Sequence, residues 1–164
     1  MNLFTGEASD EYFGSDTPPA VRRLLARASQ STSPNEREAL LWTAQATAPD
    51  CLAVYYLLYK FHAQRREFEL AERAARKGLV SAARQAGLPE DWSRELPLGV
   101  DFSQPGPARF WLFTLKALAF ISLRRGHSAE TARLLARIDF LDPQQSVGGD
   151  VIAALLRSAR GDSR

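Results

Sequence analysis

The chain has 164 residues, of which 45% are hydrophobic and 24% are charged. This length favours a single compact domain, and this composition excludes disorder over the whole chain. The 21 basic and 19 acidic residues are interleaved along the sequence, which argues against a nucleic-acid-binding tail. A single cysteine excludes an internal disulfide and a cysteine-based zinc site, and it fits a reducing compartment.

Residues 1–17 are acidic and carry four carboxylate side chains. They have neither the basic start nor the apolar run of a secretory signal. No stretch of the sequence reaches the roughly 18 apolar residues of a membrane helix. We therefore expect a disordered acidic arm over residues 1–17, one domain over residues 18–160, and a cytoplasmic location. An alternative is that the arm lies in a basic groove of the same or a neighbouring molecule.

A first pair of helices is predicted over residues 18–51. Apolar side chains recur there at helical spacings in two stretches, and Pro49 follows the second stretch. Because proline cannot continue a helix, Pro49 is expected to end this pair. The apolar positions are Val21, Leu24, Ala28, Leu41 and Ala44.

A second pair is predicted over residues 52–85, where the same spacings are clearest. The pattern is interrupted once, at residues 65–67, which predicts a tight turn between two helices. The insertion that follows, over residues 86–111, is rich in glycine and proline and is predicted to be a loop on one face of the molecule. Pro107 fits the first turn of the next helix, where its missing N–H costs nothing.

A third pair is predicted over residues 112–145, with a turn at Gly126 and an end at Pro143. Leu115, Leu118 and Leu135 supply its apolar positions. After it, residues 147–160 form one more amphipathic pattern. We expect this last helix to cap the stack, because terminal repeats need a solvated outer face.

These three units resemble tetratricopeptide repeats. In the second unit, Tyr55, Leu58, Phe68, Ala71 and Gly78 occupy positions where that family has aromatic, leucine and small residues. The family's small residues allow two helices to cross closely. The resemblance implies an all-α fold, a right-handed superhelical stack of about three helix pairs with a C-terminal capping helix. The sequence departs from the pattern at Arg37, Tyr59, His62, Ala75, Ser122 and Thr131.

One departure carries a structural expectation. Tyr59 is bulky where the family has a small residue, which predicts either a wider crossing of the two helices or a ring turned outward. In addition, residues 106–126 and 141–152 resemble small repeat proteins encoded beside bacterial nitrogen-fixation genes. In length and three-repeat build, the chain is also similar to type III secretion chaperones, although those proteins are generally acidic.

The resemblance implies a protein-interaction module that holds a partner peptide in a concave groove lined by the first helix of each pair. The inward positions of those helices are basic and aromatic, which suits an extended or acidic peptide. The alternative is that the charged residues form a solvated face and that the aromatic residues belong to the core. The candidate partner-binding residues are Arg22, Tyr56, Lys60, Gln64, Lys116, Phe120 and Arg124.

The segment that starts at Phe110 is apolar almost all round. Its side chains are expected either to be buried in the stack or to anchor a partner, including a second copy through Trp111 and Phe113. His62 and His127 have no acidic or thiol neighbour at metal-ligand spacing, so we predict no metal site. No phosphate loop, nucleophile elbow or carboxylate pair is present, and we predict no cofactor and no enzyme activity.

A nucleic-acid-binding repeat is the alternative from another functional class. It would use a run of basic residues in the second unit, but three glutamates intervene and favour an ordinary surface helix with internal ion pairs. The basic residues are Arg65, Arg66, Arg73, Arg76, Lys77 and Arg84.

Overall fold

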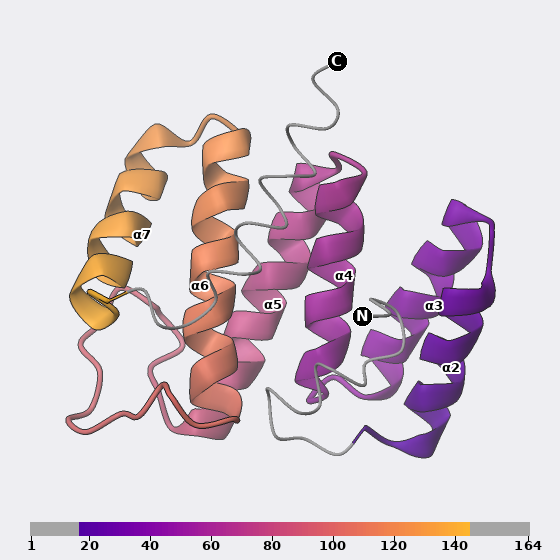
Figure 1. Cartoon of the computed structure of the whole chain (residues 1–164), viewed down its shortest axis with the longest axis horizontal. Coiled ribbons are helices and arrows are strands. Elements are labelled where there is room, and N and C mark those ends of the chain that lie inside the picture. Colours follow the sequence, from indigo (N-terminus) through magenta and orange to yellow (C-terminus); the bar gives the residue numbers. More distant parts are fainter. Residues whose placement is uncertain (1–16, 145–164) are drawn as a thin grey trace.

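A computed structural model describes residues 17–144, which form six α-helices. The helices lie side by side in the order of the sequence, each packing on the next (Figure 1). No strand occurs within these residues, so the all-α prediction is confirmed for this part of the chain. The three successive pairs are α2 (Pro19–Gln30) with α3 (Pro34–Thr47), α4 (Leu52–Gln64) with α5 (Phe68–Ala86), and α6 (Pro107–Arg124) with α7 (Ser128–Leu141).

The ends of the helices follow local sequence rules. Ser33 caps α3 by accepting a hydrogen bond from the Glu36 N–H at 3.3 Å, and Pro107 stands at the start of α6, as expected. The predicted acidic arm, apart from Thr17, and the predicted helix over residues 147–160 lie outside the described residues.

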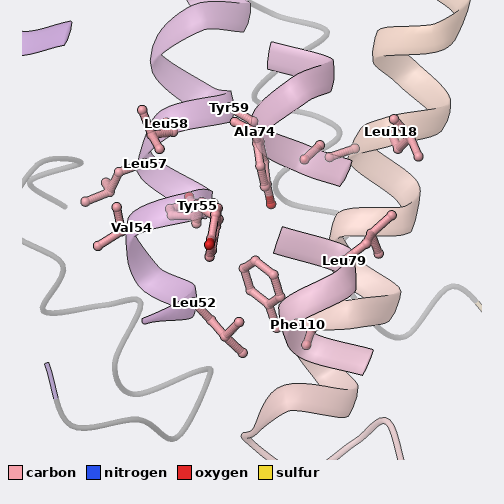
Figure 2. Close-up of a cluster of buried hydrophobic side chains, with 14 of the residues drawn as sticks. Leu52, Val54, Tyr55, Leu57, Leu58, Tyr59, Ala74, Leu79, Phe110 and Leu118 are labelled. Atoms are coloured by element: carbon pink, nitrogen blue, oxygen red, sulfur yellow. The ribbon is translucent and has the colours of Figure 1, made fainter. Parts of the chain in front are cut away.

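Helix α5 lies between α4 and α6 and packs extensively on both. Its buried residues are mostly alanine. A methyl group added at Gly78 would lie 2.9 Å from Tyr55 Cβ and 3.3 Å from Phe110 Cε1. Figure 2 shows Tyr55, Leu79 and Phe110, from three different helices, meeting in one apolar cluster. The small residue expected at position 78 is therefore required by close approach on two sides.

Of the two alternatives expected for Tyr59, the structure excludes the ring turned toward solvent. The side chain is fully buried, and its hydroxyl lies 3.4 Å from Thr114 Oγ1 of α6. Burial raises the pKa of the Tyr59 hydroxyl, so it stays protonated. A bulky residue is tolerated here because it spans the gap from α4 to α6.

The turns inside the second and third pairs have the same hydrogen bonds. Glu67 N–H donates to the His62 carbonyl at 2.9 Å, and His127 N–H donates to the Ser122 carbonyl at 3.0 Å. Both turns also contain one residue with positive φ, Arg66 at 61° and Gly126 at 78°. The two helix pairs are therefore structural repeats in which one turn has arginine where the other has glycine.

This difference generates a stability prediction. Arg66→Gly removes a left-handed non-glycine residue and is expected to raise the free energy of unfolding by up to about 1 kcal/mol, whereas Gly126→Ala lowers it by a similar amount. Urea denaturation followed by circular dichroism measures both effects. Arg73→Ala, at an exposed site on α5, is the control and should change little. Equal effects of the two turn variants would contradict the prediction.

Candidate functional site

The first helices of the second and third pairs meet in a cluster of aromatic and polar side chains. The Tyr56 ring on α4 lies 5.8 Å from the Phe113 ring on α6, and it also meets the Tyr59 ring edge-on at 5.8 Å. Lys60 Nζ donates to the Tyr56 hydroxyl at 3.2 Å and lies 5.4 Å from the centre of its ring. Two predicted binding residues, Tyr56 and Lys60, are thus in direct contact, and both are buried.

A second cluster joins the ends of α5 and α6. The Phe68 ring lies 6.5 Å from the Phe120 ring, and the Arg124 guanidinium lies 5.3 Å from the centre of the Phe68 ring. Phe120 is buried, whereas Arg124 is partly exposed. Gln64, at the end of α4, is also partly exposed and occupies the position in its helix pair that Arg124 occupies in the next.

Lys116 forms a buried ion pair that sequence reasoning missed. Its Nζ lies 2.6 Å from Asp142 Oδ2, and the two side chains are only 5% and 6% exposed. Asp142 is the C-cap residue of α7, so the ion pair ties the end of α7 to the middle of α6. Lys116 therefore has a structural partner inside the chain, whatever else it contacts.

The structure does not bring all the predicted partner-binding residues together. Arg22 is exposed on α2, which packs against α3 and against no other described helix.

Trp111 is fully buried and stacks on Phe102 of the loop at 6.0 Å, so its surface is used within the chain. Phe113 is partly exposed. Loop residue Trp92 contacts α7 through the Arg133 guanidinium, 5.4 Å from its ring.

His62 is held in a buried polar chain between α3 and α5. Trp42 Nε1–H donates to His62 Nε2 at 3.1 Å, and His62 Nδ1 lies 3.3 Å from Glu67 Oε1, which also accepts from Arg65 Nε at 2.8 Å. The indole donor requires an unprotonated Nε2, so the neutral ring carries its proton on Nδ1. His62 thus links α3 to the start of α5.

The expectation that His127 has no acidic neighbour was wrong, because Glu130, three residues later, and Glu72 of α5 both lie close to it. One ligand atom each from Glu72, His127 and Glu130 lies within 4.8 Å of the others, which is a possible metal-binding geometry. Arg125 Nη1 lies 2.6 Å from Glu72 Oε2, however, and Arg76 pairs with Glu130. Two guanidinium groups thus already neutralise these carboxylates, and the cluster is an ion-pair network that joins α5 to α7.

Comparisons with known proteins give one informative match. The chain is 29% identical over 160 residues to an uncharacterized 19.8 kDa protein in the nifW 5' region of Azotobacter chroococcum mcd 1, and the alignment covers 95% of this chain and 89% of that protein. No protein-family model matches, and no solved structure matches. The match agrees with the predicted resemblance to proteins encoded beside nitrogen-fixation genes, while no tetratricopeptide family is detected.

The described helices are all too short or too polar to cross a membrane.

The buried ion pair gives a prediction for stability. Asp142→Asn leaves the Lys116 ammonium group buried without its charge partner, and it is expected to cost about 3–5 kcal/mol of unfolding free energy. The double variant Lys116→Met/Asp142→Leu removes both charges and should recover most of this loss. Chemical denaturation measures the effect, with Arg84→Ala, which breaks an exposed ion pair with Glu90, as the control. A loss no greater than that of the control would contradict the role of the pair.

Glu67 gives a prediction for pH dependence. Burial acts to raise the pKa of its carboxyl, but the hydrogen bonds from Arg65 and His62 outweigh burial and lower it. Folding therefore favours the carboxylate. The stabilisation that the Glu67 carboxylate provides is complete when the pH is above the pKa of this carboxyl in the unfolded chain, near 4.5. It is lost as the pH falls through the lower pKa of the same carboxyl in the folded chain.

The wild type should accordingly be more stable than Glu67→Gln at pH 7, and the difference should shrink as the pH falls below about 4.5. Unfolding midpoints from pH 7 to pH 3 measure it. Glu69→Gln, at an exposed site on the same helix, is the control. A difference that stays constant over this range would show that Glu67 does not act through its charge.

Proposed function

We propose that this protein is an interaction module of the tetratricopeptide type, a right-handed superhelical stack of helix pairs whose inner face holds a segment of another protein. The observation that carries the proposal is the repetition of one helix hairpin. The second and third pairs share the hydrogen bonds of their turns, and their first helices meet through the Tyr56 and Phe113 rings. Repeated hairpins that stack in this way form an extended surface suited to a peptide.

The burial of the predicted residues divides their roles within this proposal. Four of the predicted residues are buried and support the inner face: Tyr56, Lys60, Lys116 and Phe120. The other two on these helices, Gln64 and Arg124, are partly exposed at equivalent ends of α4 and α6. An arginine and a polar amide at equivalent helix ends suit a peptide that carries carboxylates. We therefore assign first contact with the partner to these two side chains.

The similarity to the Azotobacter protein supports a narrower version, in which the chain is an accessory protein associated with nitrogen fixation. A nucleic-acid-binding surface has less support. Arg65 pairs with Glu67, Arg76 with Glu130, and Arg84 with Glu90, so three of the basic residues in the second pair are neutralised by carboxylates. The proposal includes a cytoplasmic location and no catalytic role.

Site-specific photo-crosslinking in the native host tests the proposal. A photoreactive amino acid at Gln64 or at Arg124 should capture the same partner polypeptide, because both positions belong to the proposed binding face. The same group at Arg73, which is exposed on α5, is the matched control and should not capture it. These sites avoid Lys116, whose replacement would disturb the buried ion pair.

Adding Arg124→Glu should weaken capture at Gln64 by about tenfold, because it reverses a charge on the proposed binding face. Capture of unrelated proteins at the two positions, or equal capture from Arg73, would overturn the assignment of this face.

A further inference from the structure

Helices α3 and α7 end their pairs in the same way. Both have 14 residues, and their C-cap residues, Ala48 and Asp142, have φ/ψ angles of −139°/78° and −140°/66°. Each cap N–H donates to the carbonyl four residues earlier, at 3.0 Å and 2.8 Å, and a proline follows each cap. The chain therefore leaves the two helices in the same local conformation, and the two sequences can be aligned from these ends.

In this alignment the inner faces agree. Leu40 corresponds to Leu134 and Ala44 to Ile138, and all four side chains are buried. The agreement fails at the position directly after Leu40 and Leu134. Leu41 is fully buried there, but the corresponding Leu135 is 49% exposed. A leucine that fits the repeat pattern is thus uncovered only in α7.

The difference arises where α4 packs against α3. Trp42 of α3 donates to His62 of α4 at 3.1 Å, and Gln45, one helical turn after Leu41, donates to the Tyr55 hydroxyl at 3.2 Å. This side of α3 is therefore the side that receives the following helix. The corresponding side of α7 carries Leu135, Ala136 and Asp139, and all three are exposed.

The exposed side of α7 also carries apolar residues from its first turn to its last, beside polar ones such as Asp139. A stripe of small and large apolar side chains runs along it, and Phe140 at its end is 78% exposed. Small side chains let a second helix approach closely, and so long an apolar stripe on an outer helix face needs a cover. We call this set the α7 stripe: Ala129, Ala132, Leu135, Ala136 and Phe140.

The sequence after α7 has the spacing that a cover requires. Four residues, 48–51, separate α3 from α4. The same separation counted from Leu141 reaches Ser146, the residue before the apolar pattern of the sequence over residues 147–160. That pattern has the 3.6-residue period of one apolar helix face. Its apolar residues are Val147, Val151, Ile152, Leu155 and Leu156.

We propose that residues 147–160 pack as a helix on the α7 stripe, in the way that α4 packs on α3. In this alignment Leu156 takes the place of His62 and Ala136 takes the place of Trp42, so an apolar contact replaces the hydrogen bond between those two rings. In this arrangement the segment covers the outer side of α7, the last described helix of the row.

Cysteine accessibility in the full-length chain tests this packing. In a Cys51→Ala background, Ala136→Cys places a thiol on the α7 stripe, and Ala46→Cys places a thiol on an exposed part of α3 as the matched control. If the segment covers the stripe, maleimide should label position 136 at least about tenfold more slowly than position 46. Equal labelling rates would overturn the proposal.

Two further variants identify the cover. Ile152→Asp/Leu156→Asp should restore fast labelling at position 136, and Leu156→Ala should give an intermediate rate even if the double variant does not fold. Arg157→Asp, on the polar side of the pattern, should leave the protection unchanged. Protection that persists in Leu156→Ala, or that is lost on dilution, would assign the cover to another surface or to a second copy and overturn the proposal.

Discussion

The close approach of three helices at Gly78 is the constraint on which the rest of the structure depends. A single added methyl group would contact Tyr55 Cβ on one side and the Phe110 ring on the other. Because the small side chains of α5 allow close packing on both sides, α4 and α6 lie near enough for the Tyr56 and Phe113 rings to contact each other. The candidate binding face therefore depends on the small residues of α5, which lies between the two helices that carry the predicted residues Tyr56 and Phe120.

Much of this organisation could be predicted from the sequence. The three helix pairs, the proline that follows α3 and the one that follows α7, and the small residue at Gly78 follow from local rules of helix periodicity and termination. These features depend on residues close together in the chain or on one repeated pattern. They are the features that a single sequence records most directly.

The details of the candidate site could not be predicted in the same way. The partner of Lys116 is a capping residue at the far end of another helix, and the acidic neighbours of His127 include Glu72 from a different pair. The ring of Tyr59 extends to Thr114 of α6 and so escapes the clash expected within its own pair. In each example the deciding contact joins elements that are distant in the sequence, and no local pattern reports it.

The join between α3 and α4 has a consequence for how the molecule unfolds. Among the helices that the structure describes, the pair α2–α3 meets the others only through this join, which is less extensive than the packing of α5 on its two neighbours. In linear arrays of this kind the opening of an end unit costs less free energy than the opening of a central one. Amide protons of α2 and α3 would then exchange with solvent through a local opening that leaves α4, α5 and α6 intact.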